Sequence, residues 1–165
     1  MLLKELNIFS HYIFPYYSQT LVSASSQEEI LEKIKEATKE NIDFKQSAYT
    51  AYHFNGVVSG ASFQLSRIVQ QANSFLPLLK GSVEATKTGC IVFVECEMFY
   101  TTKVLLAIWT VLPLIIFIFN LFLANGLFYA LIALFFGLFN YFVTVANFHR
   151  QRRISMEVFN KVLNN

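Results

Sequence analysis

Two uninterrupted apolar runs, at residues 104–123 and 127–146, follow one another in the last third of the chain. Neither run contains Asp, Glu, Lys, Arg or His. As a helix each would be about 30 Å long, which matches the hydrocarbon core of a bilayer, and helices buried in soluble proteins rarely stay uncharged over ~20 residues. The sequence therefore predicts a transmembrane helical hairpin at residues 103–148, with the lipid bilayer as a partner.

Basic residues flank the two runs, whereas the turn between them carries no charge. Basic residues stay preferentially on the cytoplasmic side of a membrane. We therefore expect a protein of the bacterial inner membrane with both termini in the cytoplasm. The basic cluster after the second run is interpreted as a topology anchor, and binding of anionic lipid headgroups is the alternative. The residues assigned to the membrane surface are Lys103, Arg150, Arg152 and Arg153.

The remaining chain divides into three parts by composition. Residues 18–102 mix polar, charged and apolar types and predict a cytoplasmic α+β domain. Residues 1–17 form an amphipathic segment or an extra strand, and no small-residue cleavage site follows that would indicate a signal peptide. Residues 149–165 predict a basic amphipathic tail helix, which lies on the membrane or packs back on the sheet.

Periodicity within residues 18–102 predicts one strand, one helix and then four strands. The first strand is expected at 18–24, and Ser26 with Glu29 forms a capping box that opens the helix. The later strands are expected at 49–58, 62–68, 78–85 and 90–100, the last in a central or covered position because both of its faces are partly apolar. The predicted fold class is α+β: a small antiparallel sheet with one N-terminal-side helix, followed by the two-helix transmembrane hairpin.

Small and amide residues recur at intervals of four and three along the second apolar run, which places them on one helical face. Helices associate in lipid through close backbone approach at such faces. The stripe is expected to pack within the hairpin or between copies in a homo-oligomer, and a water-filled pore is the less favoured alternative. Thr110 and Asn140 lie at similar depths and are candidates for a hydrogen bond across the hairpin or between copies. The predicted packing residues are Gly126, Ala130, Ala133, Gly137, Asn140 and Thr144, with Thr110 and Asn120 on the first run.

The phrases SFQLSRI, NSFLPLLKGSVE and TGCIVFVECEM, followed by two apolar runs, resemble a group of small uncharacterised bacterial membrane proteins. In these proteins a β-rich cytoplasmic module precedes a C-terminal helical hairpin, and the resemblance implies no activity. The opening strand and its Ser-capped helix are also similar to the start of START-like lipid-binding folds. That similarity implies a cleft for an apolar ligand between sheet and helix, although this chain reaches the membrane before it could supply their long closing helix.

No local pattern predicts a reaction centre. The three histidines are far apart, no phosphate-binding loop or nucleophile elbow is present, and a net charge of +2 is too small and scattered for a nucleic-acid footprint. Cys90 and Cys96 would lie about 20 Å apart on one strand, too far for a disulfide, and are expected to be packing residues. We expect no catalytic residue, no metal and no cofactor.

Two function classes remain. The first is a membrane-anchored binding or scaffold protein that takes an unidentified small-molecule ligand or a membrane protein partner and oligomerises through its transmembrane helices. The second is a membrane-disrupting effector, toxin-like or antiphage, gated by the cytoplasmic domain. The loop at residues 69–77 is a candidate ligand loop, and burial in the core at a strand start is its favoured alternative. Its residues of interest are Asn73, Phe75 and Leu76.

Overall fold

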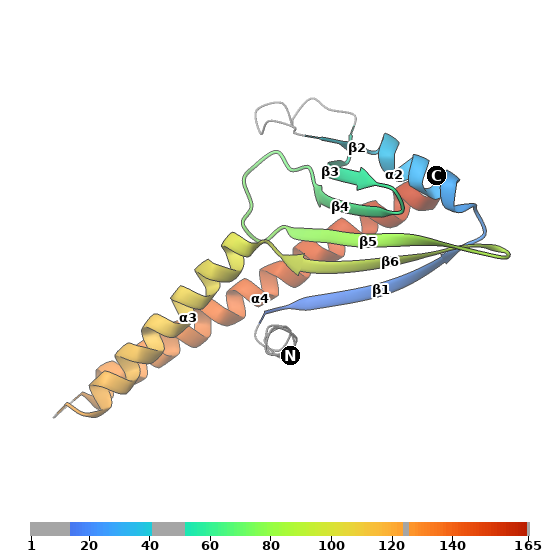
Figure 1. Ribbon diagram of the computed structural model, residues 1–165. Coiled ribbons are helices and arrows are strands. Elements are labelled where there is room, and N and C mark those ends of the chain that lie inside the picture. Colours follow the sequence, from blue (N-terminus) through green and yellow to red (C-terminus); the bar gives the residue numbers. More distant parts are fainter. Residues whose placement is uncertain (1–13, 41–51, 124–125, 165) are drawn as a thin grey trace.

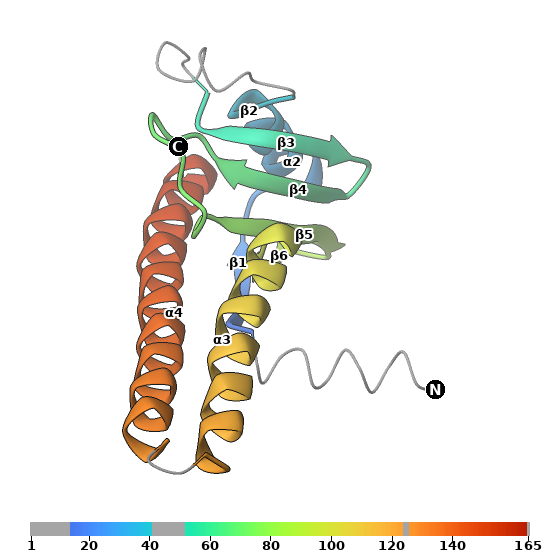
Figure 2. The same ribbon diagram turned by 90° about the vertical axis from the view of Figure 1, so that its left-hand side faces the viewer.

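The computed structural model describes residues 14–40, 52–123 and 126–164 (Figure 1). A sheet with one short helix forms one end of the molecule, and a pair of long helices projects from it (Figures 1 and 2). The fold is therefore α+β with a helical hairpin, as predicted. The elements are β1 (Tyr16–Ser23), α2 (Gln27–Glu36), β2 (Thr38–Lys39), β3 (Phe54–Ser59), β4 (Ser62–Arg67), β5 (Pro77–Thr86), β6 (Gly89–Met98), α3 (Tyr100–Leu121) and α4 (Leu127–Asn164).

The six strands form one sheet in the order β1-β6-β5-β4-β3-β2. All neighbours are antiparallel except the two-residue β2, which pairs parallel with β3 and was not predicted. The expected central place of the last strand is confirmed, because β6 lies between β1 and β5. β1 begins at Tyr16, inside the segment that was set apart at 1–17, and β3 begins at Phe54. Residues 1–13 and 49–51 of the predicted segments lie outside the described residues.

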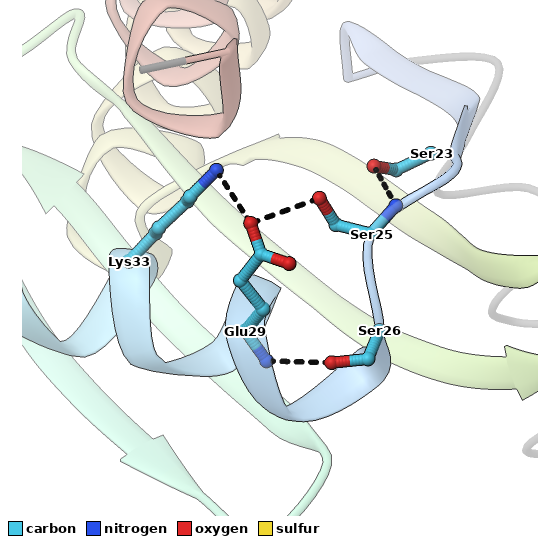
Figure 3. Close-up of polar contacts among 5 residues, drawn as sticks. All are labelled: Ser23, Ser25, Ser26, Glu29 and Lys33. Carbon is cyan, nitrogen blue, oxygen red and sulfur yellow. Dashed lines mark hydrogen bonds and ion pairs between the residues drawn. The ribbon is translucent and has the colours of Figure 1, made fainter.

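Helix α2 begins at the predicted cap (Figure 3). The Glu29 backbone N–H donates to Ser26 Oγ at 3.2 Å. The Glu29 carboxylate accepts from Ser25 Oγ at 3.0 Å and pairs with Lys33 Nζ at 3.1 Å. In a capping box the Glu carboxylate accepts from the backbone N–H of the N-cap residue. Here the Glu29 carboxylate accepts from the Ser25 hydroxyl instead. These two contacts lower the pKa of Glu29, with the hydrogen bond from Lys33 the larger cause.

One face of the sheet is covered by α2 and by the C-terminal part of α4 (Figure 1). Phe159 of α4 has no exposed surface, and its ring lies 5.4 Å from that of Phe63 and 6.0 Å from that of Phe54, measured between centroids. Full burial of such side chains contributes about 1.5–3 kcal/mol each. The buried apolar core comprises Ile30, Ile34, Phe54, Phe63, Leu65, Leu79, Val83, Cys90, Val92, Val94, Cys96, Met156, Phe159 and Val162.

Helix α4 runs without a break for 38 residues, from Leu127 to Asn164. We call residues 127–146 its membrane half and residues 147–164 its sheet half. The sequence was compatible with a tail at 149–165 that lies on the membrane or one that packs on the sheet. In the structure residues up to 164 continue α4 and pack on the sheet. The chain thus returns from the hairpin to cover the sheet with the C-terminal part of α4, after the two apolar runs.

Helices α3 and α4 are each long and apolar enough to cross a membrane. Only 11% of the most apolar window of α3 is buried in the protein, and 17% of that of α4. The core helix of a soluble protein would bury most of such a window, because exposed apolar surface is unfavourable in water. The two helices lie side by side along the hairpin and project away from the sheet (Figures 1 and 2).

Cys90 and Cys96 are both fully buried on the core face of β6, and neither forms a disulfide. Cys96 Sγ lies 3.6 Å from Met156 Sδ of α4. Burial raises the pKa of the Cys96 thiol to about 11, against a smaller lowering by Arg152. A thiol in that state is a poor nucleophile near neutral pH. Their predicted role as packing residues is consistent with these positions.

Candidate binding groove and membrane junction

The sheet face opposite α2 and α4 is largely exposed, and we call it the open face. Side chains alternate across a strand, so residues at every second position belong to it. The register places Asn55, Ser66, Leu78 and Glu97 in one cross-strand row of this face. Glu97 lies three residues before Tyr100, where α3 begins, so the row belongs to the end of the sheet from which the hairpin projects.

A groove with a volume of about 310 Å³ lies at this end of the sheet. Phe99, the residue between β6 and α3, forms part of its wall. Three of the seven lining residues have polar uncharged side chains, three have apolar side chains and one is a glycine. The volume is at the lower end of the range for small-molecule sites. The lining residues are Asn55, Gly56, Val57, Gln64, Ser66, Leu78 and Phe99.

Glu97 holds two lysines beside the groove. Its Oε2 accepts from Lys103 Nζ of α3 at 2.6 Å, and its Oε1 pairs with Lys80 of β5. Partial burial raises the pKa of Glu97, but the hydrogen bonds from Lys103 and Lys80 outweigh this effect, so the pKa lies below its ordinary value. One strand away, burial and a hydrogen bond to Glu95 raise the pKa of Tyr16 to about 12. The carboxylate of Glu97 thus ties β5 and β6 to the first turn of α3.

A second apolar cluster joins the sheet to the hairpin, and we call it the junction cluster. Met98 of β6, Leu106 of α3 and Phe148 of α4 form its centre, each at most 4% exposed. Phe14 and Tyr141 pack around them. Nearby, Thr102 Oγ1 donates to the Ser74 carbonyl at 2.8 Å. These contacts position the first turns of α3 against the sheet.

The predicted stripe of small residues packs inside the hairpin. Gly126, Ala130, Gly137 and Thr144 are buried, and Ala133 and Asn140 are half-buried. A Cβ added at Gly137 would lie 3.0 Å from Pro113 Cβ and 3.9 Å from the Thr110 carbonyl oxygen. Of the two partners left open by the sequence, the first helix of the same hairpin therefore covers this stripe.

Polar side chains of the hairpin bond to their own helices. Thr110 Oγ1 donates to the Leu106 carbonyl at 2.7 Å, and Asn120 Nδ2 to the Ile116 carbonyl at 2.8 Å. Thr110 thus uses its hydroxyl proton within α3, which leaves its oxygen as the acceptor for the predicted pair, and among the described residues no hydrogen bond joins its side chain to Asn140. Such i−4 bonds satisfy polar groups locally in an apolar medium.

The residues assigned to the membrane surface have different surroundings. The guanidinium of Arg152 lies 3.9 Å from the ring centroid of Tyr17, which is a cation–π contact with β1. Lys103 is paired with Glu97. Arg150 and Arg153 are exposed. Two of the four residues therefore take part in the contact between helices and sheet.

The candidate ligand loop forms a turn of its own. Asn73 Oδ1 accepts from the Phe75 backbone N–H at 2.9 Å, and the Leu76 N–H donates to the Asn73 carbonyl at 3.3 Å. Phe75 and Leu76 are half-buried, and none of the three lines the groove. Leu78, two residues further along, does line it.

The groove residues were not singled out from the sequence. Asn55, Gln64 and Ser66 belong to two strands and show only the polar alternation that any exposed sheet face has. The sequence also implied, through the START-like similarity, a cleft between sheet and helix. That space is filled by the core around Phe159, and the groove lies on the other face. Comparison with protein-family models, with curated proteins and with solved structures finds no match to this chain.

Proposed function

We propose that this chain is an integral protein of the bacterial inner membrane that holds a binding module at the cytoplasmic surface. The observation that carries the proposal is the continuity of α4. Its membrane half exposes large apolar side chains, and its sheet half closes the core of the sheet. A module built in this way cannot leave the membrane without losing part of its own core.

The charges support the proposed orientation. Exposed Arg150 and Arg153 lie where α4 leaves the apolar run, and Lys103 lies at the corresponding level of α3. The residues described at the other end of the hairpin, 118–123 and 126–130, are uncharged. Basic residues on the sheet side favour a cytoplasmic sheet module with both termini in the cytoplasm.

The open face supports a binding or scaffold role. No helix of the described residues covers it, and its groove combines apolar and uncharged polar lining next to the membrane. Pockets of this mixed composition are typical of ligand sites. The ligand would thus be held between the membrane anchor and the exposed strands, where a protein partner could also contact it.

Self-association through the transmembrane helices is a separate part of the proposal. Because the small-residue stripe is used within the hairpin, a homo-oligomer would have to form through the exposed Leu and Phe faces of α3 and α4. An effector that opens the membrane would need polar groups along a pore, whereas Thr110, Asn120 and Asn147 each bond to their own helix. The binding module is therefore the favoured function.

Membrane insertion and orientation are tested together by cysteine labelling. Glu84→Cys reports on the exposed open face and Phe122→Cys, at an 85% exposed residue, on the hairpin turn. An impermeant maleimide should label Phe122→Cys in spheroplasts and Glu84→Cys only in inverted vesicles. Labelling of both positions from one side would contradict the proposal, as would release of the protein by alkaline carbonate. Rapid dye entry on expression, with growth arrest, would favour the effector instead.

A further inference from the structure

The groove on the open face carries three uncharged polar side chains with free hydrogen-bonding capacity. Among the described residues, Asn55, Gln64 and Ser66 line it without a side-chain hydrogen bond to one another or to a neighbour. Each amide offers donors and an acceptor, and a hydroxyl offers both. A ligand that satisfies all three would present hydroxyl or amide groups, which also donate and accept.

The lysines on the Glu97 side of the groove are already paired. Lys80 is the register partner of Gln64, and Lys39 of β2 is the register partner of Asn55. Both Lys80 and Lys103 are paired with Glu97. Binding of an anion by Lys80 or Lys103 would require its ion pair with Glu97 to break. An uncharged head leaves both pairs intact.

The end of the groove nearest to the hairpin is apolar, because Phe99 directly precedes α3. Leu78 is level with Glu97, two residues before Phe99, and α3 begins at the next residue. At ~3.3 Å per strand residue and ~1.5 Å per helix residue, Leu78 is about 15 Å from the apolar run that begins at Val104. That distance is comparable to the thickness of a headgroup layer with its adjoining water. Phe99 lies between the groove and the bilayer.

We propose that this groove binds the uncharged, hydroxyl- or amide-bearing head of an amphiphile that reaches it from the bilayer surface. The head contacts Asn55, Gln64 and Ser66, and its first apolar carbons lie against Leu78 and Phe99. This inference rests on the proposed insertion of α3 and α4. It extends that function by naming the ligand class of the module.

Photolabelling of the full chain in phosphatidylcholine nanodiscs tests the inference. The probe is a monoacylglycerol with a diazirine close to its head, and the adducts are mapped by mass spectrometry. Adducts are expected on β5 or Phe99 as well as on the lipid-facing side of α3. Gln64→Ala and Ser66→Val should each reduce the groove adducts about fivefold, since each removes one hydrogen bond of about 1 kcal/mol. Ser62→Val, on the same strand outside the groove lining, is the control and should leave them unchanged.

The outcomes separate this inference from the proposed function. Adducts on α3 without adducts in the groove would overturn the inference and leave membrane insertion standing. Absence of adducts from α3 would instead overturn the insertion. The same probe with a phosphate head should label the groove at least fivefold less. Stronger labelling by the phosphate probe would overturn the uncharged ligand class.

Discussion

The two halves of α4 bury opposite kinds of side chain. In the membrane half the buried residues are small, Ala130, Gly137 and Thr144, and large residues such as Phe135 are exposed. In the sheet half the buried residues include large ones, Phe148, Met156 and Phe159, beside the small Ser155, and Arg150 is among the exposed ones. Helices in lipid gain little by burying large apolar groups and pack through small ones, whereas burial of large apolar groups drives folding in water. The packing of the two halves thus matches that expected in two different solvents, which supports the proposed insertion.

Removal of one large ring from each half of α4 should give the largest difference in the free energy of unfolding. Phe159→Ala deletes a fully buried ring of the core and should lower the free energy of unfolding by about 3–5 kcal/mol. Phe135→Ala removes a ring that is 69% exposed and should change it by less than about 1 kcal/mol. Denaturant unfolding in detergent micelles measures both. Equal losses would show that the two halves are not in different solvents.

A charge placed on each exposed apolar surface tests the same contrast. Ile115 is 57% exposed near the middle of α3, and Val22 is 82% exposed on β1. Ile115→Arg should disfavour insertion by about 2.5–3.5 kcal/mol, because arginine at the bilayer centre is costly. Val22→Arg should leave membrane association unchanged. The membrane-bound fraction after expression is the measurement, and normal insertion of Ile115→Arg would contradict a spanning α3.

The small-residue stripe is tested by adding bulk. Gly137→Leu places atoms against Pro113 and should lower the free energy of unfolding by about 1–3 kcal/mol through overpacking. Ala146→Leu, at an exposed position of the same half, is the control and should be neutral. Native mass spectrometry in detergent should show no change in oligomer mass for either variant. Dissociation caused by Gly137→Leu alone would place the stripe between copies.

The smallest expected effect concerns Glu97. Because its pKa in the folded protein lies below the ordinary value of 4.5, its contribution to stability is complete above about pH 4.5 and is lost as the pH falls through the folded pKa. Glu97→Gln should lower the free energy of unfolding by about 1 kcal/mol at pH 7, a modest amount because the pair is partly solvated. The difference from the native protein should shrink as the pH falls below the ordinary value of 4.5, as thermal unfolding scans can show. A difference that does not change with pH would exclude the ion pairs as its cause.

Patterns that repeat along the chain predicted much of the fold. The charge-free runs indicated α3 and the membrane half of α4, Ser26 indicated the start of α2, and alternation indicated four later strands. The continuity of α4 was harder to predict, because Arg150, Arg152 and Arg153 are equally compatible with a helix that ends at the membrane surface. In the structure Arg152 stacks on Tyr17 of β1, whereas Arg150 and Arg153 are exposed.

The candidate groove depended on contacts that no local pattern encodes. Asn55, Ser66 and Leu78 become neighbours only through strand register, and Phe99 joins them because β6 leads directly into α3. The stripe at Gly137 was predictable from its spacing, but its partner was not, because an intramolecular and an intermolecular helix offer the same chemistry. Pro113 of the same hairpin occupies that place in the structure.

In the proposed arrangement α4 is one straight helix from the membrane to the core of the sheet. Spin labels at Leu131→Cys and Lys161→Cys, both exposed positions, would be 30 residues apart on it, with buried Cys90 and Cys96 left unlabelled. At ~1.5 Å per residue, pulsed dipolar spectroscopy in nanodiscs should give one narrow distance distribution near ~45 Å. A broad distribution, or a maximum below ~35 Å, would show that the two halves bend apart and would contradict a module closed by its own membrane anchor.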